Sequence, residues 1–120
     1  MRKIDYVSEI IKCCQKREEV LLKGQSIKIY NRYFDKMRKL ARQLFNENRQ
    51  DELLPYLASD SISIQKDIAG LLFNWYPELC TITLERIANM TIPTGLPKHL
   101  AIVAGAAYSI LKHGIPKDYP

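Results

Sequence analysis

The sequence predicts an all-α protein of about six helices, arranged as antiparallel pairs in a stack of helical repeats. Two segments of similar pattern lead to this prediction, one over roughly residues 53–75 and one over residues 84–112. In each segment a short apolar stretch is followed by a break and then by apolar residues at helical spacing, as in a repeat of helix pairs. The offset between the segments is 35 residues at one pair of alanines and 30 at another, so the repeat is loose. No segment alternates apolar and polar residues for long enough to predict a strand.

The first 48 residues predict one helix pair. Apolar residues from Ile4 to Leu22 fall near one face of a first helix, and Gly24 is a typical helix end. Ser26 can cap a second helix that ends near residues 46–48. The apolar positions of this second helix step by three and four residues, which is the strongest helical pattern in the chain. These positions are Ile27, Tyr30, Phe34, Met37, Ala41 and Leu44.

Four shorter helices are predicted in the rest of the chain. Pro55 makes the third helix short or kinked, because proline removes a backbone donor. Ser61 can cap a fourth helix that runs to about residue 74, and Pro77 suits the first turn of a fifth that reaches about residue 90. After a loop over residues 91–95, a sixth helix is expected to continue until Gly114 closes it.

Charge divides the chain near its middle. Residues 1–50 hold 13 Lys and Arg against 6 Asp and Glu, whereas residues 51–120 hold 5 against 7. A chain of 120 residues with 47% hydrophobic residues is long enough to bury a conventional core. We therefore expect a single helical domain over residues 1–120, with a basic helical pair over residues 1–48 and two further helix pairs over residues 49–115.

The sequence shows no pattern typical of an active site. Hydrolysis or group transfer needs a nucleophile and base, paired carboxylates or a metal cluster. His99 and His113 are 14 residues apart on one predicted helix, which separates them by about 21 Å along its axis, so they cannot share a metal ion. Cys80 lies near the start of the fifth helix, where the helix dipole is expected to lower its thiol pKa, but without a partner it is expected to act as a buried apolar residue. We expect no enzymatic activity, no cofactor and no metal.

The chain is expected to remain in the cytoplasm and away from membranes. Its longest charge-free apolar stretch, residues 100–111, has 12 residues, whereas a membrane-spanning helix needs roughly 20. Asp5, Glu9 and Lys12 interrupt any apolar segment that follows the basic first residues, so a signal peptide is not expected. Three cysteines kept as reduced thiols also fit a cytoplasmic protein.

A row of cations follows the second predicted helix on the side opposite its apolar stripe. At 100° per residue these side chains fall within about 120° of arc and form a ridge about 20 Å long. The ridge is either a solvated helix face or a docking strip for an acidic protein or a nucleic-acid backbone. Asp35 interrupts it, and no aromatic residue lies on it to stack a base, which weighs against nucleic acid. The cations are Lys28, Arg32, Lys36, Lys39 and Arg42.

Two large aromatic residues stand at the predicted corner between the fourth and fifth helices. Aromatic side chains at such corners either fill the core or anchor a contact with a partner. We expect Trp75 to pack in the core and consider Tyr76 a candidate contact residue.

Several short stretches over residues 50–112 occur in the order expected of paired repeat helices. They are Leu53-Leu54-Pro55, Ser59-Asp60, Ile64-Gln65, Leu71-Leu72, Pro77-Glu78 and Leu84-Glu85-Arg86-Ile87-Ala88. In these stretches the chain resembles a family of small bacterial HEAT-like domains, some of which look like immunity proteins of polymorphic toxin systems. The sequence departs from the family at Gln65, where a HEAT-like helix commonly carries arginine, and the basic second helix lies outside the resemblance.

The resemblance implies a HEAT-like stack and an immunity protein that neutralises a cognate toxin, as in contact-dependent growth inhibition. The toxin would be the C-terminal domain of a secreted protein, often a nuclease, and neutralisation would be steric occlusion without turnover. Two alternatives remain open, a HEAT-like scaffold that binds nucleic acid through the basic helix and a generic protein-interaction adaptor. The residues expected to bind the partner are Lys28, Arg32, Lys36, Lys39, Arg42 and Tyr76.

Overall fold

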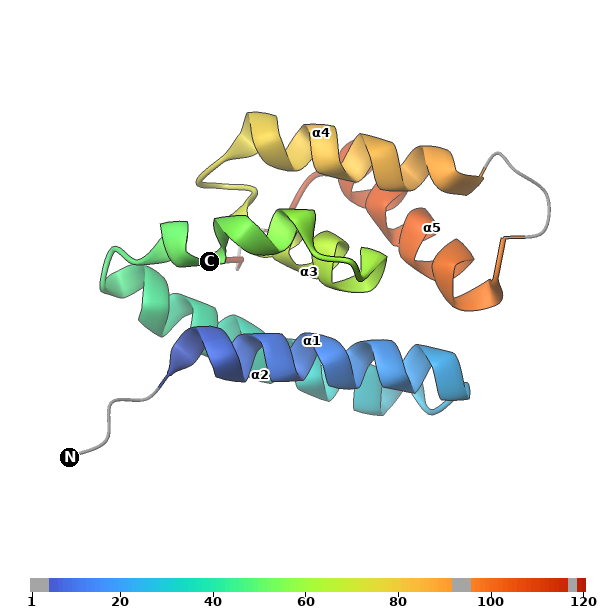
Figure 1. Cartoon of the computed structure of the whole chain (residues 1–120), viewed down its shortest axis with the longest axis horizontal. Coiled ribbons are helices and arrows are strands. Elements are labelled where there is room, and N and C mark those ends of the chain that lie inside the picture. Colours follow the sequence, from blue (N-terminus) through green and yellow to red (C-terminus); the bar gives the residue numbers. More distant parts are fainter. Residues whose placement is uncertain (1–4, 92–95, 117–118) are drawn as a thin grey trace.

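The helices pair in the order in which they follow one another along the chain (Figure 1). The computed structural model describes residues 5–91, 96–116 and 119–120, and it contains no strand within them. The elements are α1 (Tyr6–Lys23), α2 (Ile27–Asn46), the 3-10 helix η1 (Gln50–Ala58), α3 (Ile62–Leu72), α4 (Pro77–Ala88), the 3-10 helix η2 (Asn89–Thr91) and α5 (Lys98–His113). The predicted all-α fold of about six helices is therefore confirmed for the described residues. The third predicted helix is the 3-10 helix η1, and the three-residue η2 directly continues α4. The predicted loop lies mostly at residues 92–95, outside the described residues.

Three layers of helices build the molecule, which measures 51 × 31 × 26 Å. α1 packs against α2 in one layer, and α4 packs against α5 in another. α3 lies between these two layers and contacts η1, α1, α4 and α5 (Figure 1). Every residue from 63 to 72 is consequently buried, so α3 has no solvent face, unlike an ordinary amphipathic surface helix.

Local signals in the sequence set most helix boundaries. The hydroxyls of Ser26 and Ser61 each accept a hydrogen bond from a backbone N–H in the first turn of the helix that follows, at 3.1 and 3.2 Å. Gly24 ends α1 with φ of 64°, a left-handed conformation that favours glycine. Pro55 lies inside η1 and Pro77 opens α4, so both prolines act as the sequence predicts.

The apolar stripe of α2 forms much of the core against α1. Met37, Ala41 and Leu44 are fully buried, which the spacing predicts. Ile27, the first residue of that stripe, is instead 64% exposed. It lies in the first turn of α2, at the end of the α1–α2 pair, where it borders an open groove described below.

Gln65 occupies a buried position that joins three elements. Its side-chain amide N–H donates to the carbonyl oxygen of Ser59, next to η1. Its Oε1 accepts a hydrogen bond of 2.7 Å from the guanidinium of Arg86 on α4. Gln65 thus ties α3 to the end of η1 and, through Arg86, to α4.

The prediction that Trp75 packs in the core is wrong. Its side chain is 41% exposed and meets the ring of Phe45 edge-on, with 5.6 Å between ring centroids. The indole N–H donates to the carbonyl oxygen of Pro120 at 3.2 Å. A buried indole N–H needs an acceptor, and the position of Trp75 at the edge of the core lets the backbone of Pro120 supply one.

None of the described helices is both long enough and apolar enough to cross a membrane.

Candidate partner-binding surface

The predicted ridge on α2 is exposed along its whole length. All five of its cations are accessible to solvent, while the opposite side of α2 packs in the core. Among the residues that the structure describes, four of them have no carboxylate within ion-pair distance. These four are Lys28, Arg32, Lys36 and Lys39. We refer to these four residues and Arg42 together as the basic strip.

Cations on the neighbouring helix are arranged differently. On α1, Lys12 pairs with Glu9 at 3.5 Å, and Lys16 and Lys23 both pair with Glu19, at 3.7 and 2.7 Å. These pairs lower the pKa of Glu19, mainly through its hydrogen bond with Lys23. Three cations of α1 are therefore paired with carboxylates of the same helix, whereas Lys28, Arg32, Lys36 and Lys39 of α2 are not paired with any carboxylate of the described residues.

Asp35 was expected to interrupt the basic strip, and the structure shows which cation it meets. Its carboxylate accepts a hydrogen bond of 3.0 Å from the guanidinium of Arg38. Arg38 is not one of the strip residues, and it also lies over the ring of Phe34, 5.2 Å from the centroid. Asp35 is therefore engaged by Arg38 and pairs with none of the four strip cations named above.

A hollow of about 250 Å³ joins the basic strip to α1. Its lining includes Lys36 from the strip, Lys12 and Lys16 from α1, and Glu9. Tyr33, which is half-buried, also lines it. The expectation that no aromatic residue accompanies the strip is therefore only partly correct, because Tyr33 lies beside Lys36.

Tyr76 has a different neighbourhood from the rest of the predicted site. It is half-buried at the start of α4 and lines a shallow hollow with Pro77, Glu78 and Leu79. The hollow that Tyr76 lines includes none of the strip residues. The structure thus brings the five cations together on one helix and leaves Tyr76 apart from them.

A groove of about 540 Å³ lies where the turn between α1 and α2 meets the start of α5. Leu22, Ile27 and Ile102 line it with much of their apolar surface exposed, at 59, 64 and 44%. The sequence analysis assigned Leu22 and Ile27 to buried helix faces and so missed this groove. The available signal was their position on either side of the turn around Gly24, where a neighbouring helix does not cover them.

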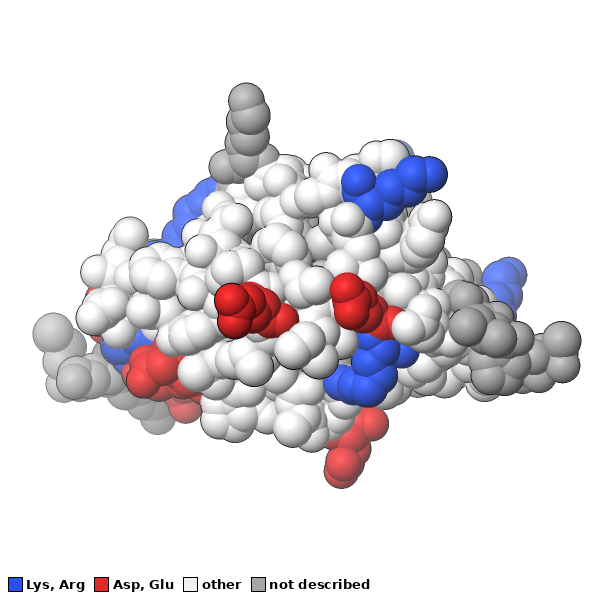
Figure 2. Space-filling model, turned by 90° about the horizontal axis from the view of Figure 1, so that it is seen from above, with Lys and Arg blue, Asp and Glu red and all other residues white. Residues whose placement is uncertain are grey.

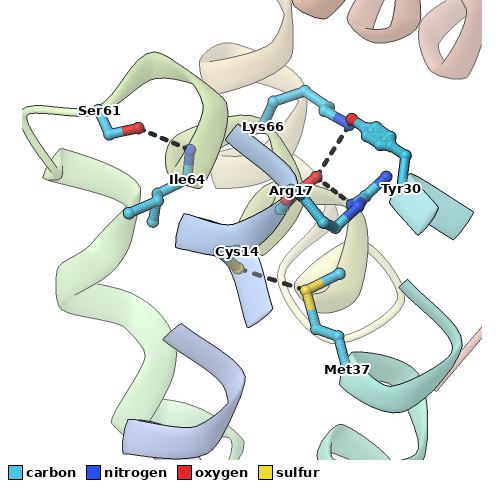
Figure 3. Close-up of polar contacts among 8 residues, drawn as sticks. Cys14, Arg17, Tyr30, Met37, Ser61, Ile64 and Lys66 are labelled. Atoms are coloured by element: carbon cyan, nitrogen blue, oxygen red, sulfur yellow. Dashed lines mark hydrogen bonds and ion pairs between the residues drawn. The ribbon is translucent and has the colours of Figure 1, made fainter. Parts of the chain in front are cut away.

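A buried polar cluster links α1, α2 and α3 (Figure 3). A single carboxylate oxygen of Asp67 accepts from the guanidinium of Arg17 at 2.6 Å and from the ammonium of Lys66 at 2.9 Å. Lys66 also lies 3.4 Å from the hydroxyl of Tyr30, whose ring is stacked 3.9 Å from the Arg17 guanidinium carbon. Two cations thus share one carboxylate, and both Asp67 Oδ2 and Arg17 Nε lack a hydrogen-bond partner among the described residues. The sequence does not predict this cluster, because burial of Lys66 and Asp67 follows from the central position of α3.

The electrostatics of this cluster keep Lys66 charged. Burial, the largest influence, acts to lower its pKa, and repulsion from Arg17 acts in the same direction. Attraction to Asp67, together with Tyr30 and the hydrogen bond to Asp67, outweighs them, so the pKa of Lys66 is raised above its ordinary value of 10.5. The ammonium is therefore held as a cation inside the protein.

The expected lowering of the Cys80 pKa is a wrong prediction. Cys80 is fully buried, and burial raises the pKa of its thiol from 9.0 to about 11, because a thiolate is poorly solvated there. Burial also raises the pKa of Cys13 and Cys14, and the Cys14 thiol donates to the sulfur of Met37 at 3.3 Å. All three cysteines are free thiols in buried positions, and Cys80 fills the small apolar position that its sequence context predicts.

These observations define the class of the protein as a small all-helical protein built from paired helices. Within the described residues, no group of three or more His, Cys, Asp and Glu side chains is placed to hold a metal ion. Comparison of the chain with protein-family models, curated proteins and solved structures finds no match in any of the three.

Proposed function

We propose that the chain is a protein-binding module without catalytic activity, and specifically a cytoplasmic immunity protein that binds a cognate toxin domain. The observation that carries this proposal is that four exposed cations on α2 have no carboxylate partner within the described part of the chain. They are Lys28, Arg32, Lys36 and Lys39. Such charges raise the local positive potential and attract an acidic partner from a distance. The resemblance of residues 50–112 to HEAT-like domains supports the more specific role of an immunity protein.

The contrast with α1 supports a binding role for the basic strip. Carboxylates next to Lys12, Lys16 and Lys23 balance the charge of α1 within the molecule. Lys28, Arg32, Lys36 and Lys39 are left to interact with charges outside it. Because buried residues between Tyr30 and Phe45 hold α2 on its inner side, the strip is a preorganised surface, and docking on it orders little of the backbone. The proposed toxin would present acidic side chains and lose access to its substrate when the complex forms.

Nucleic-acid binding is the second candidate, and one observation favours it. Tyr33 lies in a hollow with Lys12, Lys16 and Lys36, which places an aromatic ring among cations, as in sites for single strands. Glu9 lines the same hollow and pairs with Lys12, which weakens its attraction for a phosphate. For this reason the protein partner remains the first proposal.

An affinity pull-down from cells of the source organism tests the proposal. The baits are the unaltered chain, Arg32→Glu in the strip and Lys112→Glu on α5, two single substitutions that change the net charge equally. We expect the unaltered chain and Lys112→Glu to retain one secreted protein's C-terminal domain, and Arg32→Glu to lose most of it. Recovery of nucleic acid in place of a single protein, released on raising the salt, would contradict the proposal and support the second candidate.

A further inference from the structure

We propose that the groove at the open end of the α1–α2 pair receives an apolar side chain from an acidic segment of the protein partner. This inference rests on the proposed function and adds an apolar contact site to the basic strip. The groove is the place where Leu22, Ile27 and Ile102 meet. Its volume of about 540 Å³ is within the roughly 300–1,000 Å³ of typical ligand pockets.

The apolar side chains that line the groove are too exposed to serve as core residues. Leu22 and Ile27 are 59 and 64% exposed, although both belong to apolar helix faces that are otherwise covered. Ile102 approaches them from the second turn of α5. An apolar surface that three elements create together is typical of a contact site, where a partner removes it from water.

The charges around the groove indicate the chemistry of the occupant. Lys23, Lys98 and His99 line it, and no Asp or Glu side chain is among its lining residues. Lys23 pairs with Glu19 at 2.7 Å, whereas Lys98 has no carboxylate within ion-pair distance in the described part of the chain. A segment with carboxylates beside its apolar anchor therefore complements this rim.

The buried cluster adds positive charge behind one wall of the groove. Tyr30 lines the groove and also lies against Lys66 and Arg17, whose two positive charges face the single carboxylate of Asp67. Charges in such an interior are weakly screened by salt. The wall formed by Tyr30 thus favours an anionic segment.

The groove and the basic strip meet only at the first turn of α2. Ile27 lines the groove and is followed directly by Lys28, the first cation of the strip. From Lys28 to Arg42 the strip extends for about 21 Å along the helix. An acidic amphipathic helix with its apolar anchor in the groove can therefore place a carboxylate near Lys28, as in other helix-in-groove complexes.

A second copy of the chain is the alternative occupant. Two grooves meeting symmetrically would bring basic rims together, which disfavours a two-fold contact. The outer face of α4 offers Leu79 and Ile82 near Glu78 and Glu85, all exposed, so a head-to-tail contact between copies is a defined outcome to test. Figure 2 looks onto the α4 side of the molecule, where acidic and basic side chains are scattered on a largely uncharged surface.

The test is an NMR titration of the isotope-labelled full chain with three synthetic helical peptides of equal length. One carries leucine on one face and glutamate on the other, the second has the same composition in scrambled order, and the third has lysine in place of glutamate. We expect the acidic amphipathic peptide to shift the amides of Leu22, Ile27 and Ile102 and to bind at least tenfold more tightly than either other peptide.

Ile27→Glu should weaken this binding at least tenfold, and Leu22→Glu should do the same. Ile82→Glu, at a position with the same 64% exposure, should leave it unchanged.

Each other outcome overturns a defined part of the proposal. Equal binding of both acidic peptides, with amide shifts confined to the basic strip, would exclude the groove as a binding site. The proposed acidic partner would still be supported. Equal binding of the acidic and basic peptides would contradict the proposed function as well. Self-association of the unaltered chain that Ile27→Glu and Ile82→Glu both abolish would assign the groove to a second copy.

Discussion

Lys66 and Arg17 lie inside the protein, whereas Lys28, Arg32, Lys36 and Lys39 lie in solvent along α2. The two buried cations are held by one carboxylate and packed against Tyr30. The four exposed cations have no carboxylate partner among the described residues. Residues of the same chemical type are thus used in two ways, and burial decides which.

The difference follows from the energetics of solvation. A cation removed from water loses several kcal/mol of hydration and needs a buried partner. An exposed cation remains hydrated, so leaving it unpaired costs little in stability. The buried cations are therefore expected to matter for folding, and the exposed ones for binding.

Removal of the shared carboxylate should have the largest effect. Asp67→Asn leaves Arg17 and Lys66 buried without a counter-charge, so we expect the free energy of unfolding to fall by about 3–5 kcal/mol. Urea denaturation followed by circular dichroism measures this loss. Asp60→Asn, at an exposed position nearby in sequence, is the control and should change stability by less than about 0.5 kcal/mol.

Alkaline pH should have the next largest effect. Folding raises the pKa of Cys80 from 9.0 to about 11, so its contribution to stability is complete below pH 9.0 and is lost as the pH rises toward 11. The loss should approach roughly 1.4 kcal/mol per pH unit in that range. Lys66 also has a raised pKa, so its contribution is lost only above 10.5. Burial also raises the pKa of Cys13 and Cys14, so these thiols add to the loss at alkaline pH. Urea denaturation at a series of pH values measures the sum of these losses.

Cys80→Ala isolates the contribution of the Cys80 thiol to the loss of stability at alkaline pH. The variant lacks the thiol, so its stability should change less than that of the unaltered chain between pH 9 and about 10.5. Identical pH profiles for the two proteins would show that the Cys80 thiol does not titrate as its burial predicts.

Neutralising one of the two buried cations should cost less than removing the carboxylate. Lys66→Met keeps a similar volume and leaves Arg17 and Asp67 as a matched pair, at the loss of the contact with Tyr30. We expect a loss of about 1–2 kcal/mol, clearly below that of Asp67→Asn, because no charge is left unpaired. A loss equal to that of Asp67→Asn in the same urea assay would mean that Lys66, and not Arg17, balances the carboxylate.

Charge reversal on the basic strip should have the smallest effect on stability. Arg32→Glu changes an exposed side chain without an ion-pair partner in the described residues, so the free energy of unfolding should change by less than about 0.5 kcal/mol. The matched substitution Lys112→Glu on α5 should behave similarly in the same assay. A large loss for Arg32→Glu alone would show that the strip contributes to folding and would remove the contrast with the buried cluster.

The elements of the fold could be predicted from the sequence because their signals are local. Ser26 and Ser61 cap helices through hydrogen bonds within one turn, and Gly24 supplies a left-handed residue. The apolar spacing of α2 likewise depends only on its own periodicity. Such signals act whatever the neighbouring helices do.

The remaining features depend on which elements become neighbours. Lys66 and Asp67 look like solvent-exposed residues in sequence, and they are buried because α3 lies between two layers. Ile27 looks like a core residue and is exposed because α2 begins at the end of the bundle. The exposure of Trp75 and the thiol pKa of Cys80 were misjudged for the same reason, since both follow from tertiary packing, although the burial of Cys80 was predicted correctly. Of the candidate site, the row of cations was predictable. The lack of described carboxylate partners for Lys28, Arg32, Lys36 and Lys39 was not, and neither was the groove.

The most direct test of the binding role of the basic strip is the association rate with the partner domain recovered in the pull-down. The rate would be measured at low and moderate salt for the unaltered chain, Arg32→Glu and Lys112→Glu. We predict a fast, salt-sensitive association for the unaltered chain and Lys112→Glu, and a slow rate with little salt dependence for Arg32→Glu. One common rate and salt dependence for all three proteins would show that the strip is only a solvated helix face.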